Sequence, residues 1–108
     1  MANAVAPNGH ERHIRAIVFK EGDKLVAQCL EYDIATQADD MGVLFDRLHL
    51  TIEAEFAACE AEGQEPKACI TPAPNYYFEM WEKRSAALTP VLVDCPKDQF
   101  ELQYAMAA

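Results

Sequence analysis

Branched and aromatic residues gather in three short runs near the start of the chain, and polar residues separate the runs. The runs cover residues 13–20, 25–32 and 34–37. Such residues favour strands, and the polar turn around Gly22 is typical of a hairpin. Strands so close in sequence usually pair with their neighbours, so we predict a three-stranded antiparallel meander. Apolar residues at both odd and even positions of the first run predict that this strand is covered on both faces.

A helical period follows the third run. Apolar residues recur every three or four positions and form one stripe: Met41, Leu44, Phe45, Leu48, Ile52, Phe56 and Cys59. Asp40 precedes the stripe and is a good N-cap, because its carboxylate accepts a hydrogen bond from a backbone N–H that has no partner within the helix. Gly63 is a natural stop, so the helix is expected to end near Glu62. We predict one long helix packed across the meander.

The second half of the chain predicts fewer and shorter elements. A proline-containing connector over 64–75 leads to a second amphipathic helix over 76–88. A short apolar run at 91–93 is a possible strand, and strict alternation over 100–106 predicts a strand that buries one face. That face carries Phe100, Leu102, Tyr104 and Met106.

The predicted fold class is therefore α+β, with a three-stranded antiparallel meander, a helix packed across it, a further helix and a C-terminal strand. Residues 1–12 have no period and are read as a flexible leader, and residues 13–108 as one domain. Four aromatic residues of the second helix either pack into the core or line a dimer face: Tyr76, Tyr77, Phe78 and Trp81.

Composition narrows the classes of function. The chain has 108 residues, of which 51% are hydrophobic, enough for one folded core. Nine Lys and Arg face eighteen Asp and Glu, which gives a formal net charge of −9. This charge disfavours nucleic-acid binding by the chain itself and attracts a basic protein surface. We find no membrane-spanning run and no signal peptide, so a cytoplasmic location is expected.

Four glutamates crowd the C-terminal half of the long helix, where negative charge opposes the helix dipole. They are Glu53, Glu55, Glu60 and Glu62. Such a cluster is either a solvated acidic face or a docking surface for a basic partner. We take these four residues as the candidate partner-binding site.

The sequence carries no recognisable catalytic set. Its cysteines, Cys29, Cys59, Cys69 and Cys95, form no C-x-x-C pair, so reduced thiols packed as small hydrophobic groups are expected. The only serine, Ser85, lies in a predicted helix without nucleophile-elbow glycines. A metal-dependent hydrolase would rest on Glu31 and Asp33 near the end of the second strand. We expect no catalytic residue, no metal and no cofactor.

One stretch of the chain carries a family resemblance. The sequence KLVAQCLEYDIATQAD, from Lys24 to Asp39, and the helix after it resemble the HicB-like antitoxin family. In that family a strand with a V-A-x-C pattern is followed by a short strand ending in T-x-G-D-T and then by an amphipathic helix. The resemblance covers about residues 13–56. It implies a truncated RNase H-like fold with a three-stranded sheet, a helix across it and a later strand.

The resemblance also implies a function. HicB antitoxins bind and mask HicA, a small basic toxin that cleaves mRNA. Many carry an added DNA-binding domain, whereas the region after Gly63 here looks like that of a stand-alone member. We therefore expect a non-catalytic protein-binding module with a small basic HicA-like partner. The alternative is a homo-oligomeric structural or small-ligand-binding domain without a toxin, and a homodimer is expected because a small sheet exposes its edges.

Overall fold

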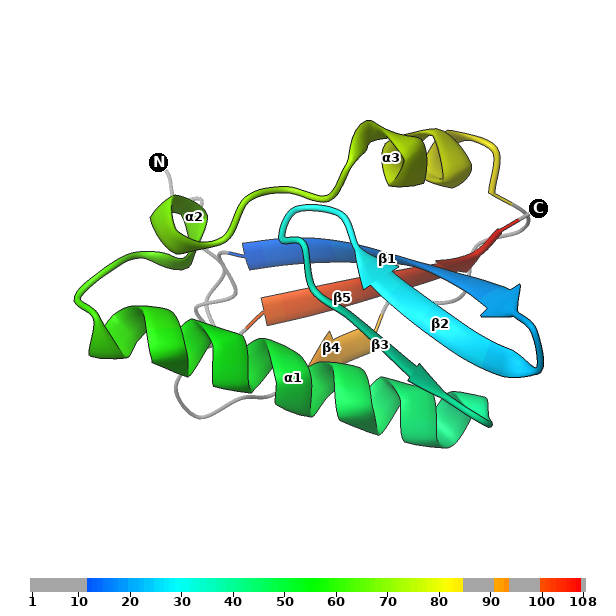
Figure 1. Ribbon diagram of the computed structural model, residues 1–108, viewed down its shortest axis with the longest axis horizontal. Helices are drawn as coiled ribbons and strands as arrows, with labels where there is room; N and C mark the ends of the chain where they lie inside the picture. Colours follow the sequence, from blue (N-terminus) through cyan, green and yellow to red (C-terminus); the bar gives the residue numbers. More distant parts are fainter. Residues whose placement is uncertain (1–11, 85–90, 94–99, 108) are drawn as a thin grey trace.

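The computed structural model describes residues 12–84, 91–93 and 100–107. A mixed sheet separates two helices, with the long α1 (Met41–Ala61) on one face and the shorter α3 (Asn75–Glu82) on the other (Figure 1). The strands lie in the order β3-β2-β1-β5-β4. The chain is therefore α+β, as the sequence predicts.

The first half of the sheet is built from neighbouring strands. β1 (Arg12–Glu21) pairs antiparallel with β2 (Lys24–Cys29), and β2 pairs antiparallel with β3 (Ala35–Ala38). Gly22 makes the first turn at a φ of +66°, a conformation that favours glycine. β2 is shorter than expected, because the Cys29 N–H donates to the carbonyl of Ile34 (2.8 Å) and the chain turns back between them.

The C-terminal strand enters the middle of the sheet. β5 (Phe100–Met106) runs parallel to β1, and the short β4 (Val91–Val93) pairs antiparallel with β5. Leu102 and Tyr104 are buried as predicted, but Met106 is only half-buried, and Ala105 on the opposite side is also buried. The prediction of a single buried face is wrong because both faces of this strand are covered.

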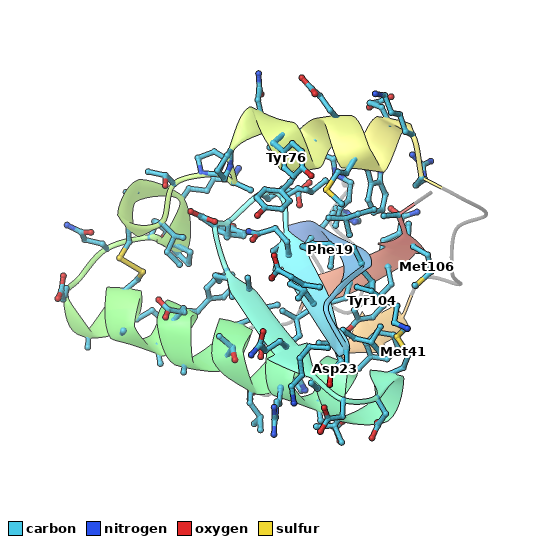
Figure 2. All side chains as sticks on the ribbon, turned by 45° about the vertical axis from the view of Figure 1, so that its right-hand side comes forward. Phe19, Asp23, Met41, Tyr76, Tyr104 and Met106 are labelled. Carbon is cyan, nitrogen blue, oxygen red and sulfur yellow. A yellow bond between two sulfur atoms is a disulfide. The ribbon has the colours of Figure 1, made fainter. Side chains whose placement is uncertain are left out.

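The strand pattern divides the core into two clusters, one on each side of the sheet. Ile14, Ala16 and Val18 of β1 face α1, whereas Ile17 belongs to the cluster under α3. Figure 2 shows the same division, with Tyr104 and Met41 on the α1 side and Phe19 below Tyr76 on the α3 side. The expectation that the first strand is covered on both faces is confirmed.

The start and stop signals of α1 act as the sequence predicts. The Asp40 carboxylate accepts a hydrogen bond from the Val43 N–H (2.9 Å), and Gly63 follows the helix at a φ of +74°. The stripe that faces the sheet is fully buried at Leu44, Leu48, Ile52, Phe56 and Cys59. α1 therefore encodes its own boundaries and its own buried face.

The connector after α1 contains a short helix that the sequence reading missed, α2 (Pro66–Cys69). Beyond α2 the chain is tied to the turn after β2, because Asp33 N–H donates to the Thr71 carbonyl (2.7 Å) and Ala73 N–H to the Leu30 carbonyl (3.0 Å). These bonds hold the connector against the end of the sheet.

The second helix is shorter than predicted. α3 ends at Glu82, because Arg84 donates from its backbone N–H and its guanidinium to the Trp81 carbonyl, at 3.1 and 2.9 Å, and so caps the last turn. The prediction of a helix over 76–88 is therefore wrong at residues 83 and 84, and residues 85–88 lie outside the described residues.

The predicted leader is shortened by one residue, because Arg12 begins β1; residues 1–11 are not among those described. Within the described part of the chain, no helix has the length and apolar character needed to cross a membrane.

Candidate partner-binding surface and pocket

The four predicted partner-binding glutamates lie on two sides of α1. Glu53 and Glu60 are seven residues apart and share one side, and Glu55 and Glu62 share the other, because each residue of a helix turns by about 100°. Glu55, Glu60 and Glu62 are exposed, and Glu53 is half-buried. The structure therefore brings them together as two pairs rather than as one acidic face.

An apolar ridge lies between the two pairs, on the side of α1 that faces away from the sheet. It consists of Leu50, Ala54, Ala57 and Ala61, all of them exposed, with Leu50 at 63%. Their spacing of four, three and four residues is that of a seam by which helices pack against each other. The sequence reading missed this ridge because the stronger stripe on the inner side accounted for the helix.

The charge around this ridge is almost wholly negative. Residues 50–65 contain no Lys, Arg or His. Arg47, one turn before Leu50, donates to the Gln37 carbonyl at the end of β3 (2.8 Å) and so holds α1 against that strand. His49 Nε2 lies 3.8 Å from Glu53 Oε2 and would partly neutralise this carboxylate when protonated. The outer face of α1 from Leu50 onward thus has an apolar centre and acidic margins.

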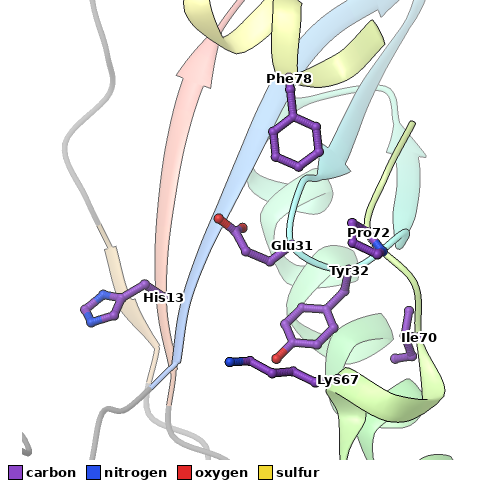
Figure 3. A pocket seen from close by; sticks show the side chains of 7 residues that line it. All are labelled: His13, Glu31, Tyr32, Lys67, Ile70, Pro72 and Phe78. Carbon is purple, nitrogen blue, oxygen red and sulfur yellow. The ribbon is translucent and has the colours of Figure 1, made fainter. Parts of the chain in front are cut away.

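A separate pocket of about 580 Å³ opens between α2, α3 and the turn after β2 (Figure 3). Four segments supply its described walls, namely β1, the turn after β2, the stretch from α2 to residue 72, and α3. The lining side chains are His13, Glu31, Tyr32, Lys67, Ile70, Pro72 and Phe78. Figure 3 shows Phe78 at one end and Lys67 at the other, with Glu31 and Tyr32 between them. Sequence reasoning did not find this pocket, since no local motif joins these residues.

Arg15 compensates Glu31, the acidic side chain among the described lining residues of the pocket. The Glu31 carboxylate accepts from Arg15 Nε (2.6 Å) and from the Arg15 backbone N–H (2.7 Å). The Arg15 guanidinium lies over the rings of Phe78 and Trp81, with 5.6 and 5.7 Å to their centroids. Glu31 therefore joins β1 to the turn after β2, and its charge is balanced.

Glu31 and Asp33, the residues on which a metal-dependent hydrolase would rest, are bound to other side chains of the fold. Glu31 is paired as described, and the Asp33 carboxylate accepts from Gln28 Nε2 (3.0 Å). Burial, and to a smaller extent the charge of Glu31, raise the pKa of the Cys29 thiol, which keeps it protonated and unreactive. In the described ranges no group of three His, Cys, Asp or Glu side chains is placed to hold a metal ion.

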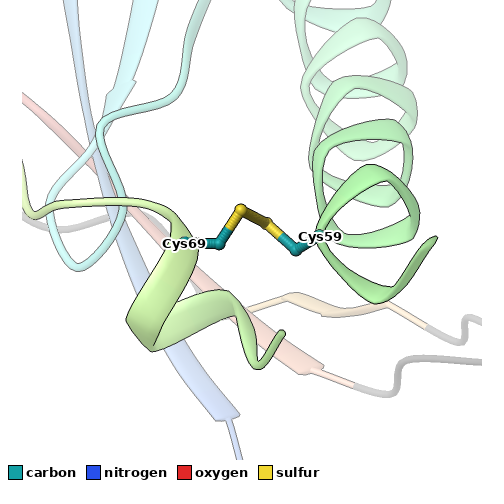
Figure 4. Close-up of a disulfide and its surroundings, with 2 residues drawn as sticks. All are labelled: Cys59 and Cys69. Carbon is teal, nitrogen blue, oxygen red and sulfur yellow. A yellow bond between two sulfur atoms is a disulfide. The ribbon is translucent and has the colours of Figure 1, made fainter. Parts of the chain in front are cut away.

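The expectation of reduced cysteines is wrong for two of them. Cys59 at the end of α1 and Cys69 at the end of α2 form a disulfide, with their Cα atoms 5.9 Å apart (Figure 4). The two cysteines meet because α2 folds back against the last turn of α1. The sequence analysis predicts a connector without a helix where α2 lies, so it did not place Cys69 beside Cys59. Cys29 is free and buried, as expected, and Cys95 is not among the described residues.

The chain was also compared with known proteins. No protein-family model, no curated protein and no solved structure matches it. The resemblance to HicB-like antitoxins therefore stays a prediction that rests on residues 13–56 alone, and the function has to be argued from the geometry of the two sites.

Proposed function

We propose that this protein is a non-catalytic binding module that docks a small basic protein on the outer face of α1, as an antitoxin masks its toxin. One observation carries the proposal. The apolar ridge on the outer face of α1, which begins at Leu50, is exposed. It lies between two pairs of glutamates, Glu53 with Glu60 and Glu55 with Glu62. An apolar centre with a polar rim is the usual arrangement of a specific protein interface.

Charge favours a basic partner over a second copy of the chain on this face. Two copies that paired through α1 would bring glutamate margins together, and like charges facing each other across an interface cost binding energy. The whole chain carries a net charge of −9, which adds to this repulsion. A partner with an apolar row between Lys or Arg residues would cover the apolar ridge and pair with the glutamates on both sides of it.

The family resemblance supports the same conclusion. The antiparallel order of β1, β2 and β3, followed by α1, agrees with the truncated RNase H-like fold that the HicB-like family is expected to have. A toxin-masking role would also place the protein in the cytoplasm. Disulfides there are mostly transient, so the docking proposal is argued from the outer face of α1 alone and does not depend on the Cys59–Cys69 bond.

The test is co-expression with the small basic protein that this proposal expects in a neighbouring reading frame. We expect a complex that protects growth and that weakens as salt concentration rises. Leu50→Asp should weaken binding at least tenfold, because it places a charge at the apolar centre of the interface. Glu55→Gln together with Glu62→Gln should mainly slow association and flatten the salt dependence.

The control is Glu79→Gln, an exposed glutamate on α3, which should leave binding unchanged. The proposal is wrong if the neighbouring protein does not bind at low salt, or if Glu79→Gln weakens the complex as much as the α1 variants do. A homodimer in sedimentation that Leu50→Asp dissociates would instead assign this face to a second copy.

A further inference from the structure

We propose that the pocket between α2 and α3 binds a small aromatic monocarboxylate, independently of the docking face on α1. Its volume of about 580 Å³ is in the range of small-molecule sites. Apolar and aromatic groups provide most of the wall: Tyr32, Ile70, Pro72 and Phe78. Tyr32 is already buried, and a flat apolar body that lies between Tyr32 and Phe78 would remove the exposed parts of Ile70, Pro72 and Phe78 from water.

The walls are fixed before any ligand arrives. The hydrogen bonds from Asp33 to Thr71 and from Ala73 to Leu30 hold the connector that carries Ile70 and Pro72. The disulfide at Cys69 fastens α2, which carries Lys67. A site that is already formed loses less conformational freedom on binding and so has higher affinity for a small ligand.

Charge decides which ligand fits. Lys67 forms no ion pair with another residue that the structure describes, and Figure 3 shows its side chain extending below Tyr32 at the end opposite Phe78. The carboxylate of Glu31 is neutralised by Arg15 at 2.6 Å. In a chain with a net charge of −9, the pocket thus offers an available ammonium group beside an apolar wall. This combination suits an anionic group attached to an aromatic ring.

Glu31 limits the ligand to one negative charge. Its carboxylate lies between the two ends of the pocket (Figure 3) and can only accept hydrogen bonds, so a second carboxylate beside it would lose water and find no donor on Glu31. A ligand hydroxyl or N–H at that position would instead find an acceptor. The structure therefore favours a monocarboxylate over a dicarboxylate of the same size.

The experiment titrates the full-length chain with 2-naphthoate and follows backbone amide signals by NMR. Two probes of matched shape serve as comparisons, neutral 2-naphthamide and dianionic naphthalene-2,6-dicarboxylate. We expect 2-naphthoate to bind about two- to fivefold more tightly than either, the range for an exposed ion pair. The signals that shift should belong to residues 31–32, 67–72 and 78.

The variant Lys67→Met keeps most of the aliphatic stem and removes the charge. It should weaken 2-naphthoate binding by the same two- to fivefold and leave 2-naphthamide unchanged, while Lys83→Met, an exposed lysine after α3, should change neither. Equal affinity of the wild-type chain for naphthoate and naphthamide would overturn the proposal, as would signal shifts outside the pocket or no binding. The comparison of probes on the wild-type chain does not depend on how either variant folds.

Discussion

The two faces of the sheet are packed to different degrees. Under α1, the inner side chains from Leu44 to Phe56 are fully buried against β1 and β5. Under α3, Trp81 is buried, but Tyr77 and Phe78 are only half-buried, and Tyr76 is 64% exposed. The first face therefore has the composition of a folding core, whereas the second leaves space beside its aromatic residues. We infer that stability resides mainly on the α1 side. The pocket lies where the two sides meet, because Tyr32 and Ile70 belong to the α1 cluster and Phe78 to the α3 cluster.

The largest effect is expected from Phe56→Ala. Phe56 is fully buried and packs edge-to-face against Tyr32, with 5.0 Å between ring centroids. Its removal should lower the free energy of unfolding by about 3–5 kcal/mol, through lost burial and the cavity that remains. Urea denaturation followed by circular dichroism measures the change.

The matched variant on the other face is Tyr77→Ala. Tyr77 is half-buried and stacks with Phe19 at 6.1 Å between ring centroids. Because less of its surface leaves water on folding, we expect a loss of only about 1–2 kcal/mol. Equal losses for Phe56→Ala and Tyr77→Ala would show that the two faces contribute alike and would remove the distinction drawn between them.

An effect between those of Phe56→Ala and Tyr77→Ala is expected from the disulfide, which connects the α1 side to the wall of the pocket. Cys59 and Cys69 are ten residues apart, and a loop of that size stabilises the fold by about 2–3 kcal/mol through the entropy of the unfolded chain. Dithiothreitol should therefore lower the urea midpoint of the wild-type chain by a corresponding amount. It should have no effect on the double variant Cys59→Ser/Cys69→Ser, and an unchanged wild-type midpoint would contradict the prediction.

Reduction of the Cys59–Cys69 bond should affect the two faces of the sheet to different degrees. The amide signals of α2, which carries Lys67, should broaden or shift, while those of the inner side of α1 stay in place. A uniform change across both faces would mean that the bond supports the whole fold rather than one wall of the pocket.

The smallest effect concerns a surface ion pair beside the start of α1. The hydrogen bond and the charge of Lys24, whose Nζ lies 2.7 Å from Asp39 Oδ1, hold the pKa of this carboxyl below its usual range. A lowered pKa stabilises the folded state above the ordinary pKa of Asp, and this contribution is lost as the pH falls through the folded value.

Lys24→Met should move the pKa of Asp39 upward, towards that of an unpaired Asp, and leave the urea midpoint at neutral pH almost unchanged, because the pair is exposed. An NMR titration of the Asp39 carboxyl measures the pKa. A large loss of stability at neutral pH would show that surface charge, and not only packing, sets the strength of the α1 side.

Local signals explain which parts of this fold could be predicted from the sequence. Asp40, Gly63 and the apolar stripe from Leu44 to Cys59 determine α1 within one stretch of chain, and Gly22 determines the first turn. The parallel pairing of β5 with β1 joins residues more than eighty positions apart, which no local pattern reports.

The same distinction between local and distant signals applies to the docking surface on α1 and to the pocket. Glu53, Glu55, Glu60 and Glu62 were visible as a cluster in the sequence, but the ridge between their two pairs became visible only once the inner side of α1 was known. The pocket was not predictable, because Glu31, Lys67 and Phe78 meet only through the hydrogen bonds and the disulfide that position the connector.

The parallel pairing of β5 with β1 determines when the sheet can be completed during synthesis. During synthesis β1 emerges well before its neighbour on one side, β5 (Phe100–Met106), which is more than eighty residues further along the chain. Until the ribosome releases that segment, one edge of β1 lacks its hydrogen-bonding partner, and Leu102 and Tyr104 are missing from the core. The nascent chain therefore completes its sheet only after residues 100–106 have left the ribosome, and until then the open edge of β1 is exposed to mispairing with other chains.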